Sequence, residues 1–454
     1  MRTRRPLGPG PFLVVGLARS GAAAALALRA RGEEVLGVDA ASPPAAQELR
    51  RAGVEVHAGD DGVELLQRAG SVVKSPGVPR EAAVIAAARA RGLPLMGELE
   101  LGWRMLANEF VAVTGTNGKT TTAELAGHIH RCAKLPVAVA GNVGAPVSGL
   151  AGEVAPDAVV VCEASSFQLE DTLHFAPEAA VLINLAPDHL DRHGTFEDYV
   201  GAKLQAFARQ RAGDVVVVPH ALLARGDGGD GPGSLLAEAL RGDPATRVTF
   251  GEREGADLRL AGGELRWRGR PLMDAGEVRL RGRHNLDNAM AAAAVCLARG
   301  VEPQAVRGGL STFAGVPHRL EEVASCQGVW FVNDSKATNV ASTLVALDAF
   351  AGAGLHLILG GQGKGQDFAP LAPAVRRSCR AVYLIGEDAE AIGAALTGAG
   401  VPLQHSGSLQ RAVQQGAAAA APGEVVLLSP ACASFDQFDD FEARGDRFRE
   451  LARG

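Results

Sequence analysis

With 454 residues, 47% of them hydrophobic and 21% charged, the chain is long enough for about three domains and too apolar to be disordered. Its formal charge of −6, without a basic block anywhere, argues against a nucleic-acid-binding protein. No apolar run reaches the roughly 18 residues that span a bilayer, and the six cysteines form no C-x-x-C pair. We therefore expect a cytoplasmic protein with reduced thiols. We also expect it to be a monomer.

The first part of the chain alternates short apolar runs with alanine- and leucine-rich stretches. The runs at 11–16 and 34–40 are typical of strands, and the stretches at 22–32 and 45–53 are typical of helices. Strands that alternate with helices indicate βαβ units around a parallel sheet. We therefore predict an α/β protein whose first domain, residues 1–108, is Rossmann-like.

The turn after the first predicted strand runs from Gly16 to Gly21, and Asp39 ends the second predicted strand. The pattern is similar to a dinucleotide fingerprint, but Ala18 stands where the fingerprint has its middle glycine. That glycine lets the backbone approach a pyrophosphate, so its loss disfavours a dinucleotide oxidoreductase. A tight turn in any α/β domain and a site for a nucleotide diphosphate held in another way both remain open.

Two further domains are predicted, at 109–315 and 316–454. In the second domain, apolar runs predict a parallel sheet with strands near 111–113, 136–140, 158–162, 180–184 and 214–218. Shorter alternating pieces predict a small antiparallel flap packed against that sheet, at 247–250, 257–260, 264–269 and 277–280, before a closing helix at 286–299. The third domain is predicted to be Rossmann-like, with strands at 328–332, 355–359, 381–385 and 424–428.

The segment "VAVTGTNGKTTT" at 111–122 combines an apolar run, a glycine-bearing loop and a Lys-Thr pair that can begin a helix. The general phosphate-loop pattern G-x-x-x-x-G-K-[ST] fails, because Val113 stands at its first glycine. Gly115 and Gly118 nevertheless allow tight turns whose N–H groups can cradle phosphate. Lys119 supplies a mobile charge and Thr120 a hydroxyl ligand for Mg²⁺. The simpler alternative is a glycine-rich βα turn in which Lys-Thr is incidental.

Polar residues follow several predicted strands, and ligands bind beyond the carboxyl ends of strands in open parallel sheets. Glu163 ends one strand and is a natural carboxylate for a metal, although alone it could be a solvated charge. His189, between Asp188 and Asp191, closes another strand, where a lone histidine is more often structural than a ligand. Together with the loop at 115–120, these residues indicate a site for a nucleotide and a metal ion.

Lysine is rare in this chain: only six of the 45 basic residues are lysine and the rest are arginine. Arginine evidently serves where a plain positive charge is enough, so each lysine is a candidate for chemistry that a guanidinium cannot perform. Lys203 lies on a predicted helix of the second domain. A neutral amine can react with CO₂ to give a carbamate, which is an oxygen ligand for a second Mg²⁺. The position of Lys203 suggests this modification.

Many of these segments resemble the Mur ligases, ATP-dependent enzymes that form amide bonds in peptidoglycan precursor synthesis. The likeness extends from about residue 12 to residue 450. It is carried by "KSPGVP", "TGTNGKTTT", "GNVG", "EASSFQLE", "PDHLDRHG", "YVGAKLQAF", "GRHNLDNAMAA", "PHRLE", "NDSKATN", "GGQGKGQDF" and "SPACASFDQFDDFEARG". The last three are most similar to the members that add D-glutamate to UDP-N-acetylmuramoyl-L-alanine. The resemblance implies a UDP-binding first domain, a P-loop ATPase centre and an amino-acid-binding last domain.

The resemblance also implies roles for single residues. Catalytic residues are Lys119, Glu163, His189 and Lys203. ATP is bound by Gly115, Thr116, Asn117, Gly118, Lys119, Thr120, Thr121, Asn285, Asn288, Arg319, Asp334 and Lys336. The UDP-substrate is bound by Arg19, Ser20, Asp39, Ser75, Gly77, Asn142 and His189. D-Glutamate is bound by Thr338, Lys364, Ser434 and Phe441, and we expect Ser434 to begin a helix whose N–H groups favour a carboxylate. Two Mg²⁺ ions are held by Thr120, Glu163, His189 and the carbamate of Lys203.

Other functions remain open at this point. A ligase of the same family that adds another amino acid, or a folylpolyglutamate synthase, would share the middle domain. A P-loop ATPase or binding module without ligase chemistry would hydrolyse ATP slowly and would not respond to a muramoyl substrate. Tight NAD binding would instead favour an oxidoreductase.

Overall fold

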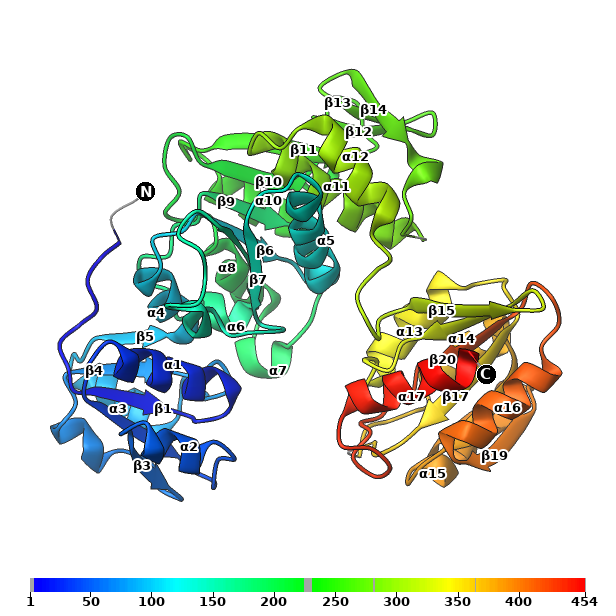
Figure 1. Cartoon of the computed structure of the whole chain (residues 1–454), viewed down its shortest axis with the longest axis horizontal. Coiled ribbons are helices and arrows are strands. Elements are labelled where there is room, and N and C mark those ends of the chain that lie inside the picture. Colours follow the sequence, from blue (N-terminus) through cyan, green and yellow to red (C-terminus); the bar gives the residue numbers. More distant parts are fainter. Residues whose placement is uncertain (1–3, 224–230, 281, 364, 454) are drawn as a thin grey trace. The chain divides into compact units, whose positions relative to one another are not determined.

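The computed structural model describes residues 4–223, 231–280, 282–363 and 365–453, which form three sheets flanked by helices (Figure 1). The chain divides into two compact units. The first is Met1–Arg279 with His284–Phe313, and the second is Leu280–Arg283 with Ala314–Gly454. No helix in the described part of the chain is both long and apolar enough to cross a membrane.

The first sheet confirms the predicted parallel arrangement, with five strands in the order β3-β2-β1-β4-β5. Its strands are β1 (Phe12–Val15), β2 (Val35–Asp39), β3 (Glu55–Ala58), β4 (Ser71–Lys74) and β5 (Leu95–Gly97). Its helices are α1 (Arg19–Ala30), α2 (Ala46–Arg51), α3 (Ala83–Ala90) and α4 (Glu98–Met105), with a 3₁₀ turn at Glu64–Gln67. The strand order reverses between β1 and β4, and a reversal of this kind is where open α/β sheets bind ligands.

The second sheet has nine strands in the order β14-β13-β12-β11-β10-β9-β6-β8-β7. Its strands are β6 (Phe110–Thr114), β7 (Val137–Gly141), β8 (Val159–Glu163), β9 (Ala179–Leu182), β10 (Val215–Pro219), β11 (Thr246–Gly251), β12 (Leu258–Ala261), β13 (Glu264–Trp267) and β14 (Arg270–Asp274). The pairs from β7 through β12 are parallel, whereas β12, β13 and β14 pair antiparallel. The predicted flap is therefore a continuation of the main sheet and not a separate one.

The prediction of a strand at 277–280 was wrong, because the third antiparallel strand is β14 and a 3₁₀ turn (Ala275–Glu277) follows it. Arg268 and Gly269 form a two-residue connection between β13 and β14, with φ of 47° and 79°. Two-residue hairpins favour positive φ at both central positions, which usually selects Asn-Gly or Gly-Gly. Arg-Gly is a weak signal for such a hairpin, and the strand that follows was missed for this reason.

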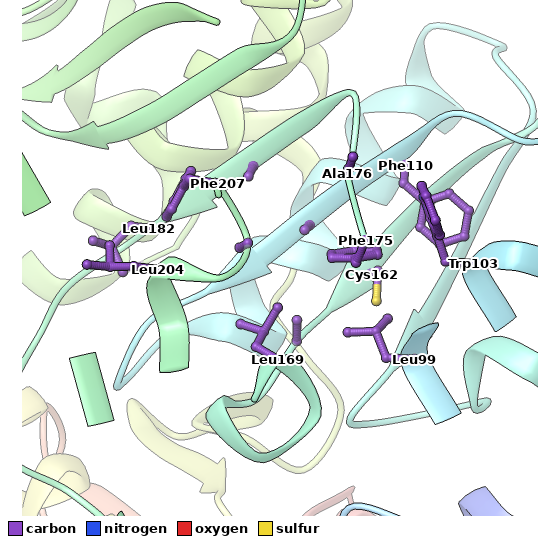
Figure 2. Close-up of a cluster of buried hydrophobic side chains, with 14 of the residues drawn as sticks. Leu99, Trp103, Phe110, Cys162, Leu169, Phe175, Ala176, Leu182, Leu204 and Phe207 are labelled. Carbon is purple, nitrogen blue, oxygen red and sulfur yellow. The ribbon is translucent and has the colours of Figure 1, made fainter. Parts of the chain in front are cut away.

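The helices of this region include those that carry the predicted site. They are α5 (Lys119–Cys132), α6 (Ser166–Leu169), α7 (Leu190–His193), α8 (Phe196–Leu204), α9 (His220–Leu223), α10 (Pro232–Ala239), α11 (Arg283–Ala298) and α12 (Pro303–Thr312), with a 3₁₀ turn at Val147–Leu150. In the buried cluster of this region, the ring of Phe175 lies edge-on to that of Trp103 of α4 and to that of Phe110 of β6 (Figure 2). The ring centroids are 5.9 and 6.3 Å apart. The core of the second sheet thus includes α4, which follows the last strand of the first sheet.

Glu100 fastens α4 to the segment before β9. Its fully buried carboxylate accepts hydrogen bonds from the backbone N–H groups of Leu173, His174 and Phe175 at 2.9 to 3.1 Å. It also pairs with Arg104, whose Nε lies 2.7 Å from Oε1. Three backbone donors therefore depend on a single side chain, and buried donors without an acceptor are costly.

Glu100→Ala is expected to destabilise the first unit by roughly 3 kcal/mol and to lower its thermal midpoint by about 5 °C, because three backbone N–H groups, that of Phe175 fully buried, lose their acceptor. Differential scanning calorimetry of both proteins measures the shift. Glu48→Ala is the matched control, because Glu48 also lies in the first turn of its helix but is exposed. Equal shifts in the two variants would contradict this role of Glu100.

The third sheet has six strands in the order β15-β16-β20-β17-β18-β19, all parallel except the β15–β16 pair. The four predicted strands are confirmed as β16 (Val329–Asn333), β17 (Leu355–Gly360), β18 (Cys379–Ile385) and β20 (Val425–Leu428). The two edge strands, β15 (Glu321–Cys326) and β19 (Leu403–Gly407), are half-exposed and were missed because neither contains a continuous apolar run. The helices are α13 (Val340–Ala349), α14 (Leu371–Ser378), α15 (Ala389–Leu396), α16 (Leu409–Ala419) and α17 (Phe441–Arg453), with a 3₁₀ turn at Thr397–Ala399.

All six cysteines are free thiols, as predicted, and four of them are buried: Cys162, Cys296, Cys379 and Cys432.

Candidate active site

The loop between β6 and α5 has the geometry that its glycines predict. Helix α5 begins at Lys119, as expected, and Gly118 precedes it with φ of 85°. A Cβ on Gly118 would lie 2.0 Å from Oδ1 of Asn288, so no other residue fits without displacing that side chain. The start of a 14-residue helix presents backbone N–H groups without intrahelical partners, which is a favourable place for phosphate.

The loop is held by two residues that sequence reasoning did not single out. Oδ1 of Asn184, after β9, accepts the N–H groups of Thr116 at 3.1 Å and Asn117 at 2.9 Å. The Tyr199 hydroxyl of α8 donates to the Thr116 hydroxyl oxygen at 3.1 Å. Burial raises the pKa of Tyr199 to about 12, so its hydroxyl stays protonated. Asn184 stands at the end of an apolar strand, and this position was the only sequence signal for it.

Two of the six lysines meet at this loop. Lys119 Nζ donates to the carbonyl oxygens of Gly115 at 3.0 Å and Thr116 at 2.8 Å, and Lys203 Nζ donates to that of Gly115 at 2.7 Å. Lys203 is 1% exposed and its Nζ lies 4.4 Å from the ring centroid of Tyr199. Burial, together with the charge of Lys119, lowers the pKa of Lys203 to about 6. At neutral pH this amine is largely uncharged and can act as a nucleophile.

Glu163 ends β8 with its carboxylate 3% exposed. Its Oε1 accepts a hydrogen bond from Nδ2 of Asn142 at 3.1 Å, and its carbonyl oxygen accepts the N–H of Asn142 at 2.9 Å. The carbonyl oxygen of Asn142 in turn accepts from Arg19 of α1 at 3.1 Å. The structure therefore places Arg19, Asn142 and Glu163 in one chain of contacts.

His189 directly precedes α7 and has a left-handed backbone, with φ of 53°. Its ring is half-exposed, and its centroid lies 4.9 Å from the ring centroid of Phe167 and 6.4 Å from that of Tyr199. Its Nε2 lies 3.4 Å from Oδ2 of Asp188. Thr120 lies buried in the first turn of α5. No cluster of three or more His, Cys, Asp and Glu side chains that could hold a metal occurs in the described ranges. The expected Mg²⁺ ligands also include the Thr120 hydroxyl and a carbamate on Lys203, which are donors of other types.

The two asparagines expected near the nucleotide lie together in α11. Asn288 is 3% exposed and its Nδ2 donates to Oδ1 of Asn285 at 3.2 Å. As its approach to Gly118 shows, Asn288 lies directly against the loop. The structure thus brings together three segments, near 115, 203 and 288, that are far apart in the sequence.

At the reversal point of the first sheet, Asp39 holds the glycine turn. Its Oδ2 accepts the N–H of Leu17 at 2.7 Å and its Oδ1 accepts that of Ala41 at 2.9 Å. The Ser75 hydroxyl, after β4, donates to the carbonyl oxygen of Gly16 at 2.6 Å. Ser20 lies in the first turn of α1, and Gly77 is exposed. Asp39 and Ser75 therefore shape a turn at the place where such sheets bind ligands.

In the second unit, Asp334 follows β16 and is 5% exposed. Its Oδ2 accepts from the Ser429 hydroxyl at 2.7 Å and its Oδ1 accepts the N–H of Leu320 at 3.2 Å. Lys336 Nζ lies 5.8 Å from the ring centroid of Phe441, and its carbonyl oxygen accepts the N–H of Thr338 at 2.9 Å. Arg319 is near enough to Asp334 to favour its ionised form.

Ser434 does not begin a helix, contrary to expectation. It begins a turn, in which its carbonyl oxygen accepts the N–H groups of Gln437 and Phe438, and the following helix begins only at Phe441. The Ser434 hydroxyl is buried without a hydrogen-bond partner in the described structure, which is uncommon for a buried polar group. Lys364, the remaining residue expected to bind D-glutamate, lies outside the described residues.

Asp334 should make the stability of the second unit depend on pH. Burial raises the pKa of Asp334 to about 7, so the folded state favours the protonated carboxyl more than the unfolded state does. The stability that this preference contributes is fully present below the unfolded pKa of about 4 and is lost as the pH rises through about 7. Asp334→Asn cannot ionise, so it is expected to gain stability relative to the parent protein over that interval. Thermal midpoints of both proteins measured from about pH 4 to pH 8 test this. A difference that does not change with pH would contradict it.

Protein-family models match the chain in three consecutive segments. "Mur ligase MurD-like, N-terminal domain" matches residues 11–97, "Mur ligase middle domain" matches 113–296, and "Mur ligase, glutamate ligase domain" matches 318–432.

Full-length relatives and solved structures agree with these matches. A UDP-N-acetylmuramoylalanine--D-glutamate ligase of Acidobacterium capsulatum is 44% identical over 451 residues, which is 97% of this chain and 95% of that protein. The protein of the same name from Solibacter usitatus is 41% identical over 448 residues, 97% of each. Among solved structures, the UDP-N-acetylmuramate-alanine ligase MurC of Thermotoga maritima has a TM-score of 0.61 at 19% identity, covering 97% of this chain and 99% of that chain. The chain therefore has the three-domain α/β fold of that structure.

Proposed function

This chain belongs to the Mur ligase family, and we propose that it uses ATP to join D-glutamate to UDP-N-acetylmuramoyl-L-alanine, a step of peptidoglycan precursor synthesis. The observation that carries the choice of substrates is the identity of 44% and 41%, over nearly the whole chain, to two ligases named for this reaction. The loop after β6 supports the use of ATP, because the amines of Lys119 and Lys203 meet there at the start of a helix, where phosphate can bind.

The reaction has two steps. The carboxylate of the L-alanyl group attacks the γ-phosphorus of ATP, the bond from that phosphorus to the bridging oxygen breaks, and ADP leaves. The amine of D-glutamate then attacks the acyl carbon, loses its extra proton and expels inorganic phosphate, leaving the amide. Phosphoryl transfer of this kind depends chiefly on positioning and on neutralising charge. Lys119, the first residue of α5, is suited to hold the transferred phosphoryl group.

We assign the loop Gly115–Thr121 as a P-loop and expect two Mg²⁺ ions beside it. Thr120 and Glu163 would hold the first ion, because hydroxyl and carboxylate oxygens suit this hard cation. Their burial at the start of α5 and the end of β8 supports the assignment. His189 and a carbamate on Lys203 would hold the second. When bound, Mg²⁺ neutralises charge on the phosphate oxygens.

The carbamate is favoured by the environment of Lys203. Its neutral Nζ attacks CO₂, a C–N bond forms, and the proton displaced from nitrogen leaves to solvent. The pKa of about 6 keeps enough neutral amine at physiological pH for this reaction. Arginine keeps its charge under all such conditions, which accounts for a lysine at this position in an arginine-rich chain.

The remaining roles follow the family pattern. Residues 1–108 form a Rossmann-like domain that binds the UDP-substrate, and 109–315 form the ATP-binding domain. Residues 316–454 form a Rossmann-like domain for the amino acid, and the division of the compact units between 313 and 314 supports this last boundary.

UDP-substrate contacts are assigned to Arg19, Ser20, Asp39, Ser75, Gly77, Asn142 and His189. Nucleotide contacts are assigned to Asn285, Asn288, Arg319, Asp334 and Lys336, and D-glutamate contacts to Thr338, Lys364, Ser434 and Phe441. The protein is proposed to act as a monomer.

The proposed function is tested by phosphate release from Mg-ATP and UDP-N-acetylmuramoyl-L-alanine in the presence of one amino acid at a time. D-Glutamate, L-glutamate, L-alanine, L-lysine and diaminopimelate form the panel. Release is expected with D-glutamate only, together with an amide product of the corresponding mass. Release with another amino acid would keep the ATP site but overturn the roles of Thr338 and Ser434. Slow release indifferent to the muramoyl substrate would identify an ATPase without ligase chemistry.

A further inference from the structure

One fully buried lysine has no part in the proposed chemistry. Lys74 ends β4 directly before the loop that contains Ser75 and Gly77. Its Nζ lies 2.5 Å from Oδ2 of Asp171 and 3.9 Å from Oε1 of Glu170, two acids that follow α6. A buried charge is tolerated only when it is paired, so this cluster fastens the end of β4 to the central part of the chain.

Arg192 of α7 holds the same loop through its backbone. Its Nη2 donates to the carbonyl oxygens of Pro76 at 2.9 Å and Val78 at 3.0 Å. The same atom lies 3.6 Å from Oε1 of Glu170, and the guanidinium carbon lies 4.3 Å from the ring centroid of Phe167. The side chain is 22% exposed, so these contacts use most of it. The guanidinium stacks on Phe167 and lies beside Glu170, and these contacts fix its orientation while it donates to the two carbonyl oxygens.

The position of Arg192 in the chain gives this contact a consequence for catalysis. Its N–H donates to the carbonyl oxygen of His189 at 3.1 Å, so the two residues belong to one short turn. This turn begins at His189, which is proposed to contact the UDP-substrate and to hold the second Mg²⁺ beside the phosphate. At the other end is the loop proposed to bind the uridine nucleotide. Arg192, together with the Lys74 cluster, therefore fixes the loop relative to the His189 turn, and so affects the spacing between the two ends of a long substrate.

We propose that Arg192 is a positioning residue for the UDP-substrate, which it serves by fixing the Ser75–Val78 loop relative to the His189 turn. Its guanidinium does not need to touch the substrate. The inference rests on the proposed function, because it assumes that the loop and the turn bind opposite ends of UDP-N-acetylmuramoyl-L-alanine. Binding energy from a remote part of a substrate aids the reaction only if the protein holds both parts in register.

The test compares steady-state kinetics of the full-length wild-type protein with Arg192→Ala, Arg192→Lys and Arg80→Ala. Arg80 is the matched control, because its Nη1 lies 4.0 Å from Oε2 of Glu170, but it is half-exposed and does not donate to the loop carbonyls in the described part of the structure. Arg192→Ala is expected to raise the KM for the UDP-substrate by about tenfold or more. The KM for ATP and that for D-glutamate should change little, and Arg80→Ala should resemble the wild type.

A second substrate separates positioning from general stability. N-Acetylmuramoyl-L-alanine lacks UDP, so the wild type and Arg192→Ala should use it with similar kcat/KM. Arg192→Lys, which keeps the charge but not the planar fork, should behave like Arg192→Ala and also serves if the alanine variant does not fold. Unchanged KM values, or an equal loss for both substrates, would overturn the inference. A wild type without D-glutamate-dependent turnover would instead refute the proposed function.

Discussion

Replacing Lys203 with arginine is expected to reduce D-glutamate-dependent phosphate release by about 100- to 1,000-fold. Arginine cannot lose its proton and so cannot form a carbamate with CO₂. The active site would lose one oxygen ligand of the second Mg²⁺ and gain a buried cation in its place. Initial rates at saturating ATP and UDP-substrate measure the effect, with Lys134→Arg, a change at an exposed lysine, as the control.

The carbamate also predicts a dependence on CO₂ and on pH. Wild-type activity should fall in buffer freed of CO₂ and return when bicarbonate is added, whereas Lys203→Arg should not respond. Because the pKa of Lys203 is about 6, the neutral fraction of the amine falls as the pH drops below that value. More bicarbonate should then be needed to restore activity. Near-normal turnover of Lys203→Arg, or activity indifferent to CO₂, would show that no carbamate is required.

Lys119→Met should lower turnover by about 1,000-fold, because the transferred phosphoryl group loses the cation that neutralises its growing charge. The volume of the side chain is nearly kept, so the β6–α5 loop should stay folded. In the present structure the Lys119 amine is held by the carbonyl oxygens of Gly115 and Thr116, and methionine cannot donate to either. Rates at several ATP concentrations separate a loss of kcat from a loss of ATP affinity.

Lys134→Met is the control for this substitution, since Lys134 is exposed beyond the C-terminus of α5. It should keep wild-type rates. Circular dichroism and the thermal midpoint verify that both variants fold. A Lys119→Met variant that folds and retains a substantial fraction of wild-type kcat would remove this residue from the phosphoryl-transfer step.

The predicted parts of the fold are those in which local pattern and tertiary structure agree. The strand before Gly115 is a fully buried apolar run, and the glycines, Lys119 and Thr120 that follow are all local features of one βα turn. The parallel arrangement of the first sheet followed from the alternation of strands and helices. The edge strands β15 and β19 and the Arg268-Gly269 hairpin were missed, because exposed strands lack a continuous apolar run and the hairpin lacks a strong turn residue.

Contacts between distant segments were the least predictable part of the site. Asn184 and Tyr199 hold the loop residue Thr116 from 68 and 83 residues further along the chain. Nothing local in the sequence indicates such pairs. Lys203 could be singled out because lysine is rare, but its burial and its contact with Gly115 became evident only in the folded chain. The composition thus identified Lys203 as an unusual residue, and the fold shows that its amine is buried against the loop.

The most direct test of the account follows an oxygen atom from the UDP-substrate. UDP-N-acetylmuramoyl-L-alanine labelled with ¹⁸O in its carboxylate is incubated with the protein, Mg-ATP and D-glutamate, and the phosphate is analysed by mass spectrometry. If the carboxylate is phosphorylated and then attacked by the amine, one labelled oxygen should be transferred to each phosphate released. Phosphate without label would show that water attacks ATP, and the proposed ligase mechanism would be wrong.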